Sequence, residues 1–143
     1  MKISDILRHK GSSVVTIAPS ESVRDLLGRL AEHNVGALVV AEADRVVGII
    51  SERDIARQLN ERGADILDLP VSELMTASVV SCRPEDDVDA IAGSMTELRI
   101  RHMPVLNGDK LAGIVTIGDV VAGRIRQLEL DRGQLEQYIT QGR

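Results

Sequence analysis

Two short motifs in this 143-residue sequence place a carboxylate three residues after a hydroxyl side chain. Ser51 is followed by Asp54, and Thr116 is followed by Asp119. Each motif comes directly after a Gly-apolar-apolar stretch, which predicts a strand that leads into the first turn of a helix. The N-terminus of a helix favours phosphate, a hydroxyl group donates to a phosphate oxygen, and a carboxylate accepts both hydrogens of a vicinal diol. The motifs therefore predict contacts to the ribose and phosphate of a nucleotide.

The same motifs also have a purely structural interpretation. A Ser/Thr-x-x-Asp sequence is related to the capping box, in which the hydroxyl and the acid satisfy free backbone N–H groups at the start of a helix. For a single motif, capping is the better interpretation. The duplication of the motif favours binding, and both interpretations stay open at this point.

The two motifs belong to an internal repeat. A shift of 65 residues places Val14–Ile55 on Val79–Val120 without a gap. Identical pairs include Pro19 and Pro84, Gly48 and Gly113, and Asp54 and Asp119. A repeat of this kind predicts two copies of one structural unit.

Each copy is predicted to fold as β-α-β-β-α. In the first copy, a short apolar run at Val14–Ile17 precedes a helix, and the runs Ala37–Ala41 and Val46–Ile50 predict a hairpin. A unit of this size has a small core, so we expect an α/β (α+β) fold with two units packed sheet to sheet as an intramolecular pseudo-dimer. The predicted boundaries are 1–66 for repeat 1, 67–126 for repeat 2 and 127–143 for a C-terminal helical tail.

The composition argues against several classes of protein. With 17 basic and 22 acidic residues the net charge is −5, and there is no Phe or Trp. Nucleic-acid-binding domains usually have a basic excess or aromatic stacking platforms. The apolar runs are far shorter than the roughly 20 residues of a membrane span, and the lone Cys82 cannot form an internal disulfide. We therefore expect a cytoplasmic protein without nucleic-acid or membrane partners.

Catalytic and metal sites are also not expected. The three histidines, His9, His33 and His102, lack metal-ligand spacing to one another or to Cys82. No nucleophile–base arrangement is legible in the sequence. We expect no metal and no enzymatic activity, with Cys82 and His33 in structural roles.

The repeat resembles a tandem pair of CBS (cystathionine β-synthase) domains, known as a Bateman module. The resemblance rests on the doubled Gly-Ile-Ile/Val-Ser/Thr-x-x-Asp element, the Pro-then-helix segment before it, and Arg101-His102-Met103-Pro104-Val105, and it covers Ile3 to about Arg124. It implies two clefts between the repeats that bind adenine nucleotides, a regulatory role without catalysis, and association into a flat homodimeric disc.

The resemblance also implies the residues of each cleft. The first would use Ser51, Arg53, Asp54, Thr76, Ser78, Val80, Ile100, Arg101, His102 and Pro104. The second would use Lys10, Ser13, Val15, Val35, Gly36, Ala37, Thr116, Gly118 and Asp119. The first cleft has Arg53 where the second has Gly118, so its charge suits phosphates better. Glu52 could oppose this, but its alternation with Ser51 predicts that it faces outward.

The expected function is a regulatory module that senses AMP, ADP, ATP or NADH and signals to an effector protein that the sequence does not identify. The alternative is an interaction scaffold that keeps the fold without sensing a ligand. The tail carries more apolar residues than one repeat needs to cover, and it predicts a long helix that is broken or bent near Gly133. We expect a homodimer that uses this tail, the alternative being a flap over its own domain.

Overall fold

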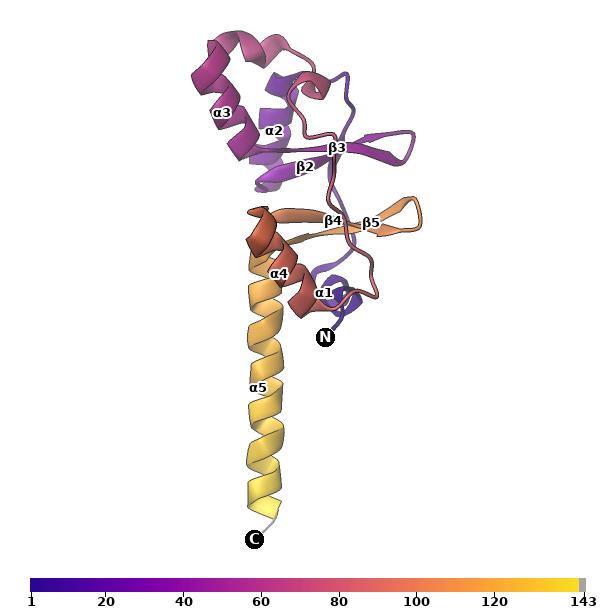
Figure 1. Cartoon of the computed structure of the whole chain (residues 1–143), viewed down its shortest axis with the longest axis vertical. Helices are drawn as coiled ribbons and strands as arrows, with labels where there is room; N and C mark the ends of the chain where they lie inside the picture. Colours follow the sequence, from indigo (N-terminus) through magenta and orange to yellow (C-terminus); the bar gives the residue numbers. More distant parts are fainter. Residues whose placement is uncertain (142–143) are drawn as a thin grey trace.

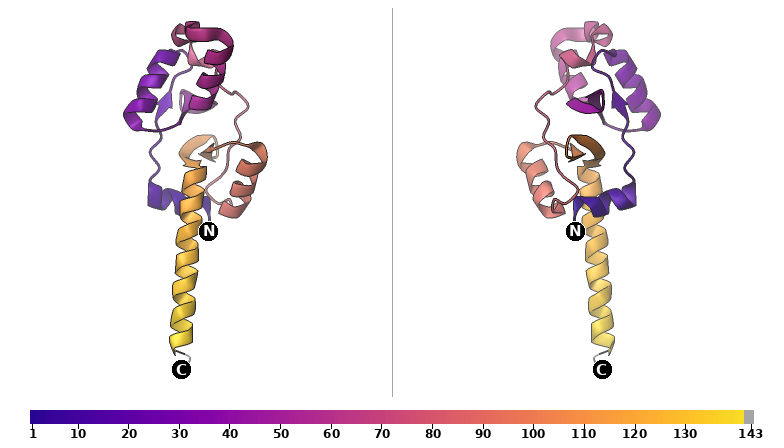
Figure 2. Two further views of the ribbon diagram at one scale, coloured as in Figure 1. Left: turned by 90° about the vertical axis from the view of Figure 1, so that its left-hand side faces the viewer. Right: turned by 90° about the vertical axis from the view of Figure 1, so that its right-hand side faces the viewer.

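The computed structural model describes residues 1–141 and has two small lobes, from which one long helix extends (Figure 1). Figure 2 shows the same separation of the two lobes from both sides. The elements in chain order are α1 (Ile3–Lys10), β1 (Thr16–Ile17), α2 (Val23–His33), β2 (Ala37–Glu42), β3 (Arg45–Ser51), α3 (Glu52–Arg62), the 3₁₀ turns η1 (Gly63–Asp68) and η2 (Val71–Glu73), α4 (Val88–Leu98), β4 (His102–Asn107), β5 (Lys110–Thr116) and α5 (Ile117–Gln141).

Each lobe is built on an antiparallel hairpin. In the first lobe β2 pairs with β3, and β1 adds a short parallel strand to β2. In the second lobe β4 pairs with β5. The turn of the first hairpin has positive φ at Ala43 (50°) and Asp44 (64°), a combination typical of the tight turns that match strand twist. The hairpins of the two lobes face each other, with contacts between β3 and β5. The predicted fold class is therefore confirmed.

The first predicted strand of each copy is shorter than expected. Only Thr16–Ile17 is a strand in the first copy, and in the second a single parallel bridge joins Cys82 to Val105. The Cys82 N–H donates to the Pro104 carbonyl at 3.0 Å, and the Leu106 N–H donates to the Cys82 carbonyl at 2.8 Å. Pro84, two residues on, has no N–H with which to extend the ladder.

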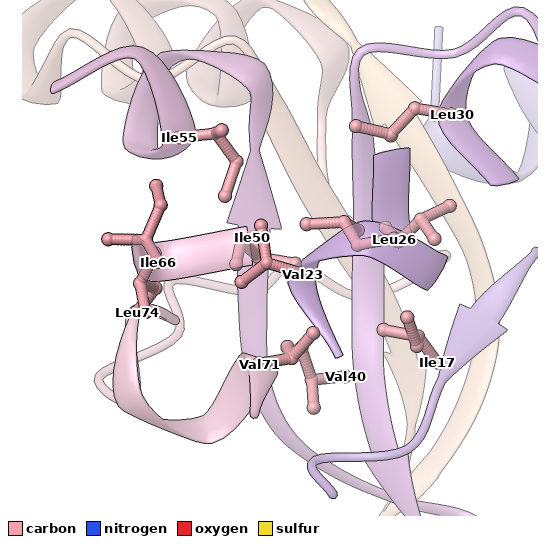
Figure 3. Packing of buried hydrophobic residues seen from close by; sticks show 11 residues of the cluster. Ile17, Val23, Leu26, Leu30, Val40, Ile50, Ile55, Ile66, Val71 and Leu74 are labelled. Atoms are coloured by element: carbon pink, nitrogen blue, oxygen red, sulfur yellow. The ribbon is translucent and has the colours of Figure 1, made fainter. Parts of the chain in front are cut away.

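The two hydrophobic cores exchange short segments of the chain. The core of the first lobe contains Ile66, Val71 and Leu74 from the connection between the repeats (Figure 3). The core of the second lobe contains Ile3 and Ile6 from the N-terminal helix α1. The segment that precedes the second repeat therefore completes the first lobe, and the helix that precedes the first repeat completes the second lobe.

The helix α5 runs without interruption from Ile117 to Gln141, so the predicted break near Gly133 is wrong. A Cβ at Gly133 would have no neighbour within 4 Å, which shows that this position faces solvent. A glycine in a helix costs about 1 kcal/mol relative to alanine, and this is not enough to end the helix. Residues 142–143 of the predicted tail lie outside the described residues.

Candidate functional site

A cleft of about 600 Å³ lies between the two lobes. This volume is in the range of small-molecule sites, which is roughly 300–1,000 Å³. It is lined by Gly36, Ala37, Ile49, Ser51, Glu52, Arg53, Asp54, Arg57, Thr76, Ser78, Val80, Leu98, Arg99, Ile100, Arg101 and His102. Both repeats thus contribute to a single cleft.

The hairpin of the first lobe brings the hydroxyl motif to the mouth of this cleft. Ala37, at the start of β2, is paired with Ser51, at the end of β3. The next N–H, that of Glu52, donates to the Gly36 carbonyl at 2.9 Å. Because α3 begins at Glu52, its first turn points into the cleft together with the ends of both strands.

The connection between the repeats forms the neighbouring wall. The Ile49 N–H donates to the Thr76 carbonyl at 3.0 Å, and the Thr76 N–H donates to the Ile49 carbonyl at 2.9 Å. Gly48 permits this approach, because a Cβ there would lie 2.5 Å from the sulfur of Met75 and 3.1 Å from the Thr76 carbonyl. Thr76 is therefore fixed beside β3, and Ser78 and Val80 follow it along the cleft.

Ser51 and Asp54 form a complete capping box at the start of α3. The Ser51 N–H and Oγ donate to Asp54 Oδ2 at 2.9 and 3.0 Å, and the Asp54 N–H donates to Ser51 Oγ at 3.3 Å. These bonds engage Oδ2 alone, and among residues 1–141 no hydrogen bond engages Oδ1. The structural interpretation of the motif is therefore correct, and one carboxylate oxygen is still available to a ligand.

The cleft is rich in cationic side chains. Arg53 and Arg57 lie on α3, and Arg99 and Arg101 lie in the short connection between α4 and β4. Within the described part of the chain, none of these four arginines takes part in a salt bridge. Against Glu52 and Asp54, the four guanidinium groups leave the cleft net positive on a chain whose net charge is −5. This charge suits an anionic ligand.

His102 stands between the lobes as a neutral side chain. Burial lowers the pKa of its imidazole, Lys10 lowers it further, and the Glu52 carboxylate only partly opposes them. A Cβ at Gly36 would lie 3.5 Å from the imidazole atoms Cε1 and Nε2. The small residues of the first copy therefore leave room for the ring that the second copy supplies.

The structure places most of the residues predicted for the first cleft on its wall. Nine of the ten line it, and the exception is Pro104, which is buried in β4 opposite Ile114. Glu52 lines the cleft, contrary to the prediction that it faces outward, because it begins α3 and does not continue the alternation of the strand. The sequence analysis also missed Ile49, Arg57, Leu98 and Arg99. Arg57 lies one helical turn after Arg53, a spacing that the sequence already contains.

The residues predicted for the second cleft are only partly brought together. Lys10 Nζ donates to Asp119 Oδ2 and, at 2.9 Å, to the Ile114 carbonyl. The Thr116 N–H also donates to Asp119 Oδ2, at 2.9 Å. Burial raises the pKa of Asp119, but the bonds from Lys10 and Thr116 more than offset this, and its pKa lies below the usual value. The second carboxylate is therefore already neutralised by a side chain of the same protein.

Of the remaining residues of that set, only Gly118 is placed beside this group. Gly36 and Ala37 line the first cleft, which corrects their predicted place, because the start of β2 is paired with the end of β3 in the same lobe. Val15 packs against the first core, Val35 and Ser13 are exposed, and Gly118 lies beside the Thr116 hydroxyl.

Three further features bear on the chemistry. Cys82 is buried in the second core, in the structural role that the sequence predicts, and burial, followed by the charge of Asp86, raises the pKa of its thiol to about 12. Among residues 1–141, no cluster of three or more His, Cys, Asp or Glu side chains could hold a metal ion. No helix of this part of the chain has the length and apolar character to cross a membrane.

Comparisons with known proteins agree with this architecture. The CBS domain pattern matches residues 3–61 and 71–125. The chain is 34% identical over 149 residues to "CBS domain-containing protein CBSX3, mitochondrial" of Arabidopsis thaliana, with 98% of this chain and 72% of that protein covered. The crystal structure of the CBS-domain containing protein ATU1752 from Agrobacterium tumefaciens superposes with a TM-score of 0.84 and 41% identity, over 87% of this chain and 99% of that one.

A further solved structure contains ligands. The CBS domain pair of protein MJ0100, in complex with 5′-methylthioadenosine and S-adenosyl-L-methionine, has a TM-score of 0.79 and 26% identity, over 89% of this chain and 98% of that one. Because the family pattern matches both halves of the sequence, this chain belongs to the CBS domain family as a tandem pair of CBS domains.

Proposed function

We propose that this protein is a regulatory module that binds an adenine nucleotide in the first cleft and has no catalytic role of its own. The observation that carries the proposal is that Ser51 and Asp54 share one cleft of about 600 Å³ with four arginines. Within residues 1–141, none of these arginines forms a salt bridge. The adenosine ligands of the MJ0100 domain pair support the adenine part of the proposal.

The charge of the cleft favours phosphate-bearing ligands. 5′-Methylthioadenosine is uncharged, and S-adenosylmethionine carries one carboxylate beside its ammonium and sulfonium groups, so neither provides a phosphate for Arg53, Arg57, Arg99 and Arg101. AMP, ADP, ATP and NADH each provide at least one phosphate group, which guanidinium groups bind well. The free Oδ1 of Asp54 would accept a hydrogen bond from a ribose hydroxyl, and the imidazole of His102 would pack against the ligand as an uncharged ring.

Signalling would follow from the place of the cleft between the lobes. A ligand that contacts both lobes shifts their relative packing only by its difference in affinity for the two arrangements. A partner protein would read this shift. We place the module in the cytoplasm, because its single cysteine, Cys82, cannot form an internal disulfide, which suits a reducing compartment.

The alternative function is an interaction scaffold without a ligand. The capping box favours it, because Asp54 Oδ2 and the Ser51 hydroxyl already have partners within α3. The two functions differ in one measurable property, which is the affinity of the first cleft for nucleotides.

Isothermal titration calorimetry with ATP, ADP, AMP, NADH and S-adenosylmethionine tests the proposal. We expect one phosphate-bearing ligand per chain, because Asp119 is held by Lys10. Asp54→Asn keeps one oxygen for the cap but loses the charge, and we expect it to weaken binding about 10- to 100-fold, the equivalent of about 1.5–3 kcal/mol for a charged hydrogen bond.

The control is Asp44→Asn, the same change in the exposed turn between β2 and β3. It should leave the affinity unchanged. If none of the five ligands binds, the scaffold function is preferred. If both variants bind a ligand as the wild type does, the assignment of Asp54 to the nucleotide site is wrong.

A further inference from the structure

The outer part of α5 has a regular apolar stripe that no other segment of residues 1–141 covers. Its apolar side chains recur with spacings of four and three residues, and the stripe is defined by Val121, Ile125, Leu128, Arg132, Leu135 and Ile139. We call these six residues the α5 seam. Its five apolar members are 51–60% exposed. Side chains of this size are normally buried, so the seam lacks its partner.

The seam is separate from the surface by which α5 packs on its own lobe. Val120 and Gly123 are the buried residues of α5, and Arg124 reaches back to Asp89 at 3.3 Å. At roughly 100° per residue, the seam lies about a third of a turn away from this packed face. Figure 1 shows that most of α5 projects beyond the second lobe, so its own domain does not fold over the seam.

The seam lies mostly outside the conserved domain. The CBS domain pattern ends at residue 125, whereas the seam continues for two more heptads to Ile139. A helical extension of this length is marginal in water without packing. Its stability and its sequence pattern therefore need an explanation other than the nucleotide site.

We infer that the α5 seam pairs with the same seam of a second copy of this chain, as a parallel two-stranded coiled coil. In heptad notation Ile125, Arg132 and Ile139 occupy a positions, and Val121, Leu128 and Leu135 occupy d positions. Isoleucine at a with leucine at d favours two parallel strands, and a single polar residue at a fixes the register.

Charge complementarity supports a second copy as the occupant. The hole that receives Arg132 in such a pair includes the preceding g residue of the copy, which is Asp131. Glu136, at the next e position, already bonds to Arg132 Nε at 3.1 Å within the chain. Each copy therefore has one cation in its seam, Arg132, and beside the seam the carboxylate of Asp131, which would pair with Arg132 of the other copy.

The experiment compares two leucines that are almost equally exposed. Leu128 is in the seam and 55% exposed, whereas Leu130 is 61% exposed and faces away from the seam at an f position. Sedimentation equilibrium of the full chain should give twice the mass for the wild type and for Leu130→Glu as for Leu128→Glu. We expect the seam substitution to weaken self-association at least tenfold.

Ile139→Glu is a second seam variant, too far from the lobes to affect their folding, and it should act in the same direction as Leu128→Glu. A wild type that sediments as a single chain of 15.5 kDa would overturn the inference. It would also be overturned if Leu128→Glu kept the wild-type mass, or if Leu130→Glu reduced it equally. Nucleotide affinity is not part of this readout, so the result is independent of the proposed function.

Discussion

At the scale of single residues, the two related carboxylates have different partners. Asp54 bonds only within its own capping box, whereas Asp119 also receives the ammonium group of Lys10. The sequence motif is the same in both copies, so the difference arises from a residue more than a hundred positions away in the chain. One acid is left for a ligand, and the other is held by the protein.

Lys10→Met tests the second arrangement through stability. The pKa of Asp119 is depressed in the folded protein, so its contribution to stability is complete above the ordinary value of 3.8 and is lost as the pH falls through the lower folded value. We expect Lys10→Met to reduce the free energy of unfolding by about 1–2 kcal/mol at pH 7.

Urea unfolding between pH 7 and pH 3 measures this difference. The gap between Lys10→Met and the wild type should narrow once the pH drops below about 4. Lys110→Met, the same change at an exposed position at the start of β5, is the control. A gap that stays constant over the whole pH range would show that Lys10 contributes through packing and not through Asp119.

At the scale of elements, each hairpin is approached closely by a segment from the start of the other repeat. The segment around Met75 and Thr76 contacts β3 at Gly48, and Leu7 of α1 contacts β5 at Gly113. Both glycines leave room for this approach. The contacts are not equivalent, since the first involves a backbone carbonyl that lines the cleft and the second involves only a leucine side chain.

Gly48→Ala should therefore be more harmful than Gly113→Ala. A Cβ at position 48 would lie 3.1 Å from the Thr76 carbonyl, which cannot rotate away, whereas one at position 113 would meet only the flexible end of Leu7 at 2.7 Å. We expect a loss of about 1–3 kcal/mol for Gly48→Ala, together with weaker nucleotide binding because Thr76 is displaced.

Urea unfolding and calorimetry on the same samples measure both effects. Gly93→Ala is the control, because a Cβ there has no neighbour within 4 Å on the helix α4, and it should stabilise the protein by up to about 1 kcal/mol. Equal losses for Gly48→Ala and Gly113→Ala would contradict the distinction between backbone and side-chain contacts.

At the scale of the whole molecule, the lobes do not coincide with the halves of the sequence. Ile6 lies in the first 66 residues but packs in the second core, and Val71 lies beyond them but packs in the first. The chain therefore crosses between the lobes at both ends of the first repeat. This exchange joins the lobes and forms the walls of the cleft.

Ile6→Ala and Val71→Ala should each loosen the lobe in which the residue packs. Each side chain is at most 1% exposed, and removing such a group from a core costs about 2–4 kcal/mol. Hydrogen exchange should increase in α4, β4 and β5 for Ile6→Ala, and in α2, β2 and β3 for Val71→Ala. Each variant is the control for the other. Faster exchange in the first lobe for Ile6→Ala, or in the second lobe for Val71→Ala, would contradict the exchange of segments.

The sequence by itself determined the repeated unit, the hairpins, the helix starts and nine of the residues that line the first cleft. The repeated unit, the hairpins and the helix starts depend on local periodicity and on short motifs, which remain visible when the two copies are aligned, whereas most of the cleft residues followed from the resemblance to CBS domains. The sequence also contained both the binding and the capping interpretation of Ser51 and Asp54, without deciding between them.

Only the tertiary structure decided which segments meet. The pairing of the β2 start with the β3 end brought Gly36 and Ala37 to the first cleft, and the crossing of α1 brought Lys10 to Asp119. Such contacts depend on how the lobes pack. Local periodicity in the sequence predicts helices and strands, but it does not predict which distant segments come into contact. The unbroken course of α5 past Gly133 was likewise set by its whole length, because one glycine is a small cost against the hydrogen bonds of a 25-residue helix.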